Sequence, residues 1–404
     1  MPPRPHAIFL ISIVFLFLAS SLLFAQSPKP YVIILSMDGF RWDYPDHYST
    51  PNLDRIASRG VKAALQPSFP SKTFPNHYTI ATGLYPDHHG IVDNSFYDPT
   101  TGRHFSTSDR QAVQDPSFYG GEPIWVTAQK NGIISASFYW VGSEAPIKGV
   151  RPTYWKHYDH DFSFEQRIDT VIYWLKLPEE LRPHLILWYM EEPDEIAHEE
   201  GPAGEKTMKM VMHLDSLMGV FLDKIDALPI AGQVNIIITS DHGMGSISPD
   251  RCVNLKKFIN YDWFDEIEGH TPNLTLKVKN EFADTAWKAL SAIPHLSAWK
   301  HGEMPDSLHY GQNPRTLDFI VAADSAWQFT MTGKVTQSRG SHGYNPYNRD
   351  MHAIFYAIGP AFKAGYKPPT FENVDIYPLI CHILKIRPEP DDGRIERVSG
   401  MLNF

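Results

Sequence analysis

The hydroxyl of a threonine at the start of a predicted helix is a candidate reactive group in this sequence. Thr73 precedes a helical pattern that has Pro75 in its first turn and Gly83 at the place of a C-terminal cap. The positive end of the helix dipole favours a bound anion or an ionised hydroxyl at this position. A threonine before a helix more often only caps a backbone N–H, so other residues must decide between the two roles.

Three carboxylates and three imidazoles elsewhere in the chain could bind metal ions: Asp38, Asp194, His198, Asp241, His242 and His342. Asp194 and His198 are four residues apart, so both side chains point the same way on a helical turn. Asp241 and His242 are adjacent, and Gly243 permits a sharp bend that directs both inward. Each pair alone is a weak signal, because such spacings occur by chance or in turns. Taken together, mixed oxygen and nitrogen ligands suit zinc, and six ligands suit two ions.

Continuous apolar runs predict the buried strands that position these ligands. The runs cover residues 31–35, 185–190, 234–239 and 353–358. Helical patterns alternate with them at residues 51–60, 124–130, 164–177 and 205–228. This alternation predicts a mainly parallel sheet with helices on both faces. In such folds a site lies beyond the carboxyl ends of the strands, and the three aspartates follow the first three runs. His342 instead lies on the approach to the fourth run.

One catalytic domain is expected over residues 26–404. Residues 140–163 are rich in aromatic side chains and lack periodicity, which indicates an insertion near the site. Residues from about 255 to 335 are polar and mixed in pattern, with one clear helix near residues 282–290. We expect them to form an inserted subdomain.

Residues 1–25 have the pattern of a secretory signal peptide. Arg4 precedes an apolar run over residues 7–18 that is too short for a membrane span, and small residues follow up to Ala25. We therefore expect a secreted or periplasmic protein with no stable membrane anchor after signal removal. The two cysteines, Cys252 and Cys381, allow either one disulfide or two free thiols.

The net charge of −10 disfavours duplex nucleic acid as a partner, because long-range attraction to a polyanion is absent. A small anionic substrate could still bind if metal ions supply positive charge locally.

A series of motifs, in order and at compatible spacing over nearly the whole mature chain, resembles the nucleotide pyrophosphatase/phosphodiesterase family of the alkaline phosphatase superfamily. The motifs lie at residues 36–41, 69–78, 82–86, 90–94, 121–125, 191–202, 241–244 and 342–343. The resemblance implies an alkaline-phosphatase-like α/β fold and a hydrolase with two zinc ions in which Thr73 is the nucleophile. Ala197 stands where the family usually has glycine, a departure that removes no ligand.

The same resemblance implies a role for each ligand. The ligands of one ion correspond to Asp194, His198 and His342, and those of the other ion, which also binds the Thr73 oxygen, correspond to Asp38, Asp241 and His242. Asn94 matches the asparagine that holds a non-bridging phosphate oxygen together with the backbone N–H of Thr73. A neutral amide at this place suits the single charge of a phosphodiester better than the dianion of a monoester, so diesterase activity is expected.

Aromatic residues near the site are candidates for binding a nucleobase. The resemblance implies that Phe74 and an aromatic residue at about Trp155, or the adjacent Tyr154, sandwich the base. Trp140 and Tyr189 are further candidates for lining the pocket. The alternative is that these aromatic side chains belong to the core or to an ordinary surface.

The sequence thus predicts a secreted or periplasmic dinuclear-zinc phosphodiesterase that acts on a small nucleotide and releases nucleoside 5′-monophosphates. A phospholipase-C-like or choline-phosphodiester hydrolase of the same family is the alternative within the same chemistry, since aromatic walls also attract a choline cation. A metal-binding protein without catalysis is the alternative from another class.

Overall fold

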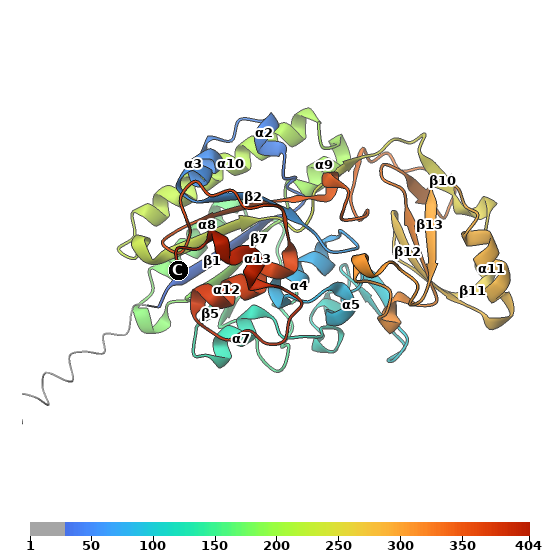
Figure 1. The fold of residues 1–404 in the computed structure, drawn as a ribbon, viewed down its shortest axis with the longest axis horizontal. Helices are drawn as coiled ribbons and strands as arrows, with labels where there is room; N and C mark the ends of the chain where they lie inside the picture. The colour runs from blue at the N-terminus through green and yellow to red at the C-terminus, as the bar shows by residue number, and fades with distance from the viewer. Residues whose placement is uncertain (1–28) are drawn as a thin grey trace, which may run out of the picture.

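An eight-stranded β-sheet forms the centre of the molecule, in the order β18-β2-β17-β8-β1-β7-β5-β6 (Figure 1). The computed structural model describes residues 29–404, so the predicted signal peptide lies outside the described residues. The central strands are β1 (Tyr31–Met37), β7 (Leu185–Met190) and β8 (Val234–Thr239), and towards one edge follow β5 (Ser135–Phe138) and β6 (Tyr154–Trp155). These five strands are parallel, which confirms the predicted mainly parallel sheet.

One strand of the sheet runs against its neighbours. β17 (Ala353–Ile358) pairs antiparallel with both β8 and β2 (Val61–Gln66), while the short β18 (Phe371–Glu372) is parallel to β2. The start of β17 therefore lies at the edge where β1, β7 and β8 end. This direction explains how a residue that precedes a strand, such as His342, reaches the same edge as residues that follow strands.

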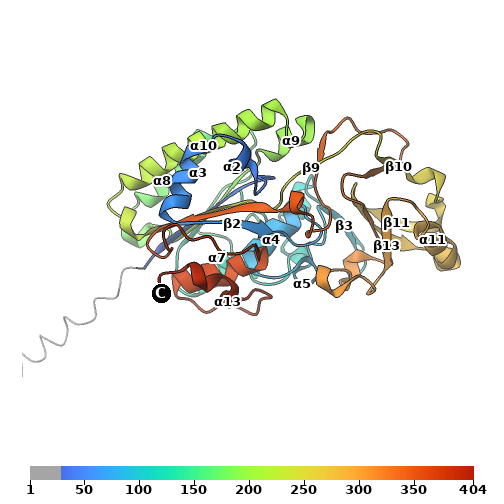
Figure 2. The same ribbon diagram turned by 45° about the horizontal axis from the view of Figure 1, so that its top comes forward.

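Helices cover both faces of the sheet (Figures 1 and 2). One face carries α3 (Pro51–Arg59), α8 (Phe164–Leu175) and α10 (Glu205–Asp226), and the other carries α4 (Thr73–Thr82), α7 (Ile124–Lys130) and α12 (Ile376–Leu384). The strand side chains alternate between these layers, as Ile34 packs into the core with α4 and α12 whereas Ile33 packs into the core with α10. Because β1 is buried on both faces, its sequence is continuously apolar.

Shorter elements connect these layers. They are α2 (Tyr44–His47), α5 (Pro86–His89), β3 (Ser95–Asp98), β4 (Arg103–Ser106), α6 (Arg110–Val113), α9 (Asp194–Glu200), β9 (Gly245–Ser246), β16 (Gly340–Ser341) and α13 (Ile395–Val398). Within residues 29–404, no helix is both long and apolar enough to cross a membrane.

A second, smaller sheet lies at one end of the molecule, in the orange part of the chain (Figure 1). Its four antiparallel strands are β11 (Phe264–Glu268), β12 (Asn273–Val278), β14 (Phe319–Ala323) and β13 (Leu296–Lys300). With α11 (Ala283–Leu290) this sheet has its own apolar core. β10 (Cys252–Asn254) and β15 (Gln328–Thr330) pair beside it. Cys252 in β10 and Cys381 in α12 are both free thiols.

Candidate active site

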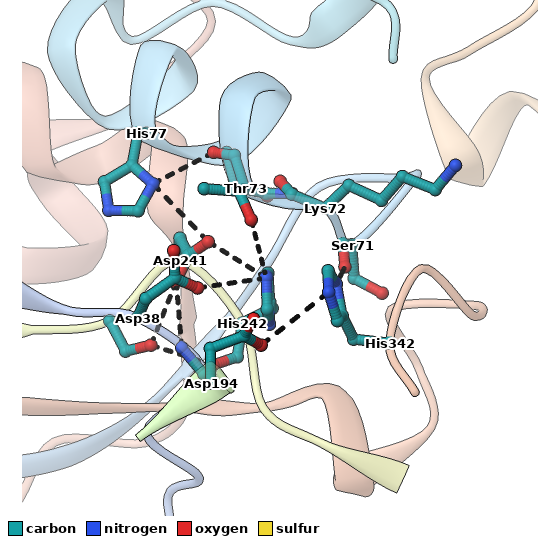
Figure 3. A network of polar contacts seen from close by, with 12 residues as sticks. Asp38, Ser71, Lys72, Thr73, His77, Asp194, Asp241, His242 and His342 are labelled. Atoms are coloured by element: carbon teal, nitrogen blue, oxygen red, sulfur yellow. Dashed lines mark hydrogen bonds and ion pairs between the residues drawn. The ribbon is translucent and has the colours of Figure 1, made fainter. Parts of the chain in front are cut away.

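The predicted ligands meet at the edge where the central strands end, and Figure 3 labels five of the six: Asp38, Asp194, Asp241, His242 and His342. Asp38 follows β1 directly, Asp241 lies two residues beyond β8, and Asp194 is the first residue of α9, which follows β7. The backbone of Gly39 has φ +66°, and an added Cβ there would lie 2.8 Å from Asp194 Oδ1. Only glycine therefore lets the turn after β1 approach the start of α9 this closely.

The first group of predicted ligands is Asp194, His198 and His342. The Nε2 atom of His198 lies 3.4 Å from Asp194 Oδ2, as expected for residues one helical turn apart. The Nε2 atom of His342 lies 3.7 Å from Asp194 Oδ1. Ala197, between two ligands of α9, is fully buried. All three predicted members of this group are thus brought together.

The second group surrounds the hydroxyl of Thr73. The Nε2 atom of His242 lies 3.0 Å from Asp241 Oδ2, 3.4 Å from Asp38 Oδ1 and 3.4 Å from Thr73 Oγ1. Figure 3 shows the Thr73 hydroxyl directed towards His242, with Asp38 and Asp241 beside it. Potential ligand atoms of Asp194 also lie within 4.8 Å of those of Asp38 and His242, so the two groups are adjacent.

Each ligand histidine is oriented by a backbone carbonyl. The Nδ1 atoms of His198, His242 and His342 lie 3.0, 2.8 and 2.9 Å from the carbonyl oxygens of Gly340, Gly243 and Ser71. Because a carbonyl can only accept, Nδ1 must carry the hydrogen in each ring. The lone pair on Nε2 is then left free, and this is the tautomer that binds a metal ion through Nε2.

The three carboxylates contain buried oxygens that lack a hydrogen-bond partner among residues 29–404. These atoms are Asp38 Oδ1, Asp194 Oδ1 and Asp241 Oδ2. A buried carboxylate oxygen without a partner is costly, and a divalent cation satisfies it. The separations of 3.0–3.7 Å between ligand atoms are close to the roughly 3.3 Å expected between tetrahedral ligands that lie about 2.0–2.1 Å from zinc. The residues present therefore fit a pair of divalent ions.

The pKa shifts of the carboxylates in the site also favour a bound cation. Burial, and then the charges of Asp241 and Asp194, raise the pKa of Asp38 well above its usual value. Burial also acts to raise the pKa of Asp241, but His242 and then His77 outweigh it and hold this pKa below the usual value. Such crowding of buried carboxylates is relieved when a cation lies between them.

His77 belongs to the site although the sequence interpretation assigned it no role. Its Nδ1 lies 2.9 Å from the carbonyl oxygen of Thr73 and 3.4 Å from Asp241 Oδ2, and its Nε2 lies 2.8 Å from Ser36 Oγ. Burial lowers the pKa of His77, so the ring is neutral. His77 thus connects the first turn of α4 to a ligand. The signals in the sequence were its position four residues after Thr73 and its place within the motif at residues 69–78.

Thr73 is the first residue of α4, and Lys72 occupies the capping position. The sequence left open whether Thr73 only caps the helix. The Thr73 hydroxyl contacts His242, and α4 has no side-chain cap.

Asn94 lies beside the start of α4, because its Oδ1 accepts a hydrogen bond of 2.9 Å from the backbone N–H of Phe74. This bond leaves the Nδ2 group of Asn94 as the end that can donate to a substrate.

A pocket beside Thr73 encloses about 540 Å³, part of it open to solvent. Three of the aromatic residues that the sequence offered as candidates for binding a base line this pocket: Phe74, Trp140 and Tyr189. The Tyr189 hydroxyl donates a 2.8 Å hydrogen bond to Asp38 Oδ2, and Trp140 Nε1 donates one of 3.0 Å to the carbonyl of His77. Both therefore also support the ligand cluster.

Trp155 and Tyr154, the two candidates for the second base-binding aromatic residue, are not among the lining residues. Both belong to β6 at the edge of the sheet, where Trp155 packs against His157 and Tyr154 packs near Trp174. Tyr158, three residues further along the same aromatic segment, lines the pocket instead. The short pairing of β6 with β5 was not visible in the sequence, and it determines which aromatic side chain reaches the cavity.

Comparisons with known proteins show what this chain is similar to. Residues 32–345 match the family model described as type I phosphodiesterase / nucleotide pyrophosphatase. A venom phosphodiesterase from Crotalus durissus collilineatus is 36% identical over 392 residues, which are 94% of this chain and 46% of the relative. The chain thus spans about half the length of the venom relatives it matches.

Two further relatives are matched over most of their length. Human bis(5′-adenosyl)-triphosphatase ENPP4 is 36% identical over 382 residues, which are 94% of this chain and 83% of the relative. The structure of a murine ectonucleotide pyrophosphatase/phosphodiesterase 5, an inactive threonine-to-alanine variant in complex with AMP, has a TM-score of 0.89 at 32% identity. The match covers 93% of this chain and 100% of that chain.

Proposed function

Because this chain belongs to the type I phosphodiesterase/nucleotide pyrophosphatase family, we propose that it hydrolyses phosphodiester or pyrophosphate bonds of small nucleotides and releases nucleoside 5′-monophosphates. Thr73 is the nucleophile, and two zinc ions are the cofactors. The observation that carries this proposal is the pair of adjacent ligand groups, one of which brings His242 Nε2 to 3.4 Å from the Thr73 hydroxyl oxygen.

The proposed zinc sites follow the two ligand groups. Asp194, His198 and His342 would hold one ion, and Asp38, Asp241 and His242 would hold the other. When bound, the ions lower the pKa of a coordinated hydroxyl and neutralise charge on the phosphate and the leaving group.

Hydrolysis then takes place in two steps. Thr73 Oγ1 forms a bond to phosphorus as the bond to the leaving group breaks, and the hydroxyl proton leaves to solvent or to the leaving group. The resulting intermediate is a nucleotidyl-threonine diester, in which the nucleoside stays bound to phosphorus. Water next attacks this phosphorus and the bond to Thr73 Oγ1 breaks, so that the nucleoside monophosphate departs and a proton restores the Thr73 hydroxyl. His77 holds the carbonyl of Thr73 throughout, and this contact keeps the nucleophile in the first turn of α4.

Asn94 favours a diester substrate. Its Oδ1 is held by the backbone N–H of Phe74, so its Nδ2 group is aimed as a neutral donor for a non-bridging phosphate oxygen. The pocket beside Thr73, between Phe74 and Tyr158, would hold the base. The relatives named for bis(5′-adenosyl)-triphosphatase activity or solved with AMP support a nucleotide as substrate.

A choline phosphodiester is the competing substrate of the same chemistry. Aromatic walls attract a quaternary ammonium ion, but Arg110 in the same lining disfavours a cation. We therefore favour the nucleotide. We also propose that the protein acts outside the cytoplasm, on the basis of its N-terminal pattern.

Metal content and product identity test this proposal together. The purified protein should contain two zinc ions per chain and convert ATP to AMP and pyrophosphate, with slower turnover of glycerophosphocholine. Thr73→Ala should retain the metal and lose turnover by at least about a thousandfold, whereas Thr73→Ser, which keeps a hydroxyl, should retain measurable activity. Full activity in Thr73→Ala would exclude Thr73 as the nucleophile.

A further inference from the structure

The pocket beside Thr73 contains one ion pair that has no role in the metal cluster. Its lining includes two charged residues, Arg110 at the start of α6 and Glu144 in the loop after β5, and Arg110 donates a hydrogen bond to the Glu144 carboxylate. Glu144 is 5% exposed, whereas the Arg110 side chain is 44% exposed. The pair thus has one buried member and one member accessible to a ligand.

Glu144 is fully occupied by donors from the protein. Its Oε1 accepts from Arg110 and, at 3.2 Å, from the backbone N–H of Tyr158. Its Oε2 lies 3.0 Å from His157 Nδ1 and 3.3 Å from Gln114 Nε2. Glu144 therefore acts as a positioning residue. It fixes the guanidinium of Arg110 and the backbone of Tyr158, two residues of the pocket lining.

Arg110 still has donors to offer. Only one of its nitrogens, Nη2, has a hydrogen-bond partner among residues 29–404, and that partner is Glu144. The remaining N–H groups belong to the planar guanidinium, which the contact with Glu144 holds in place from one side. The pair therefore offers a ligand in this pocket the free N–H groups of Arg110 but no free acceptor, because both oxygens of Glu144 already have partners.

Purine bases differ in what they present to such a guanidinium. Guanine has two adjacent acceptors, O6 and N7, and arginine binds them in a bidentate manner. Adenine instead has one acceptor, N7, beside an N6 amino group. This amino group is a donor, so it cannot accept a hydrogen bond from the second N–H group of the guanidinium. We infer that Arg110 makes this pocket selective for guanine over adenine nucleotides. The inference rests on the proposed nucleotide diesterase activity and names the base that the same site prefers.

Competition between two substrates measures this selectivity directly. An equimolar mixture of GTP and ATP is supplied to the metal-loaded protein, and the initial ratio of GMP to AMP gives the ratio of the two kcat/KM values. We expect a ratio of about 10 for the unmodified protein, as one bidentate base contact is worth roughly that factor or more. Arg110→Gln should bring the ratio close to one, and Arg110→Lys, which keeps the charge but not the planar guanidinium, should give an intermediate value.

Arg103→Gln is the matched control, since Arg103 is also an exposed arginine paired with a carboxylate, that of Asp115, and does not line the pocket. It should leave the ratio unchanged. A ratio at or below one in the unmodified protein, or a ratio that Arg110→Gln does not lower, overturns the inference. If neither triphosphate is cleaved, the proposed function fails instead, so the two failures are distinct.

Discussion

Among the described residues of the pocket lining, Tyr189 is the one whose side chain donates a hydrogen bond to a carboxylate proposed as a ligand. It donates to Asp38 Oδ2 at 2.8 Å, which leaves Asp38 Oδ1 directed at His242. Asp38 is the carboxylate whose pKa is raised, first by burial and then by its acidic neighbours. A donor to Oδ2 therefore favours the ionised form that a metal ion requires.

Removing this donor should weaken metal binding. Tyr189→Phe is expected to lower zinc affinity by about tenfold or more, as for other hydrogen bonds that orient a metal ligand. The measurement is a competitive titration with a zinc chelator at fixed pH. Tyr158→Phe is the matched control, because Tyr158 lines the same pocket and its hydroxyl makes no hydrogen bond among the described residues. Equal affinities for the two variants would contradict the account.

The structure brings together the six residues predicted as ligands, whereas Trp155 and Tyr154 lie outside the pocket lining. Asp38, Asp194 and Asp241 follow apolar strand runs, from which their chemistry stands out, and His198 lies one helical turn after Asp194. His77 and Tyr158 were not assigned, because an imidazole inside a helix and a tyrosine among other aromatic residues look the same whether they pack or bind. Their roles depend on side-chain contacts between segments far apart in the chain.

The start of α4 is joined to the neighbouring loop by a buried ion pair. Lys72, which precedes Thr73, lies 2.8 Å from Asp93, and both side chains are less than 8% exposed. Asp93 also accepts from the backbone N–H of Asn94, and Lys72 Nζ lies 3.3 Å from the carbonyl of His270. One ion pair thus holds together the nucleophile, the phosphate-binding amide and the segment between β11 and β12.

Breaking this pair should destabilise the protein strongly. Lys72→Met leaves the Asp93 charge buried and uncompensated, which costs about 3–5 kcal/mol of unfolding free energy. Urea denaturation measures the loss. The double variant Lys72→Met/Asp93→Asn should lose less than the sum of the two single variants, because it removes both charges. Lys62→Met, which breaks the more exposed pair with Asp46, should cost about 1 kcal/mol or less.

The elements that the sequence predicted best are those buried on both faces. The runs 185–190 and 234–239 coincide with β7 and β8, since a strand in a covered parallel sheet is apolar throughout. The direction of β17 was not predictable, because periodicity carries no information on pairing. The four-stranded sheet at residues 264–323 was also missed, as two of its strands, β11 and β13, are short and partly exposed.

The smaller sheet is anchored to the main body near α5. Asp87 accepts hydrogen bonds from the backbone N–H groups of Gly311 and Gln312, and Arg315 lies 2.9 Å from Asp98. The last residue of α5, His89, is fully buried and connects it to α4, with Nε2 3.0 Å from Thr79 Oγ1. Its Nδ1 accepts from the backbone N–H of Ile91. The ring must therefore be neutral in the folded protein.

This buried imidazole makes the whole molecule sensitive to acid. Burial lowers the pKa of His89 from 6.5 to about 3. The unfolded chain takes up a proton below pH 6.5 whereas the folded chain does not, so the stabilisation is complete above that pH and is lost as the pH falls towards 3. Between pH 7.5 and 5, His89 should account for a loss of about 2 kcal/mol of unfolding free energy.

Urea denaturation at the two pH values tests this expectation. His89→Gln should show a smaller difference between them than the unmodified protein, by about 2 kcal/mol. His213→Gln, at an exposed position of α10, should behave like the unmodified protein. An unchanged difference in His89→Gln would show that other groups cause the acid sensitivity.

The central claim is that folding places two metal ions beside the Thr73 hydroxyl. The most direct measurement is an anomalous difference map from crystals of the purified protein, recorded on both sides of the zinc absorption edge. Two peaks are expected, one among Asp194, His198 and His342 and the other among Asp38, Asp241 and His242, the second within bonding distance of Thr73 Oγ1. A map from zinc-loaded crystals with no peak at these residues, or with zinc bound only elsewhere, would contradict the account.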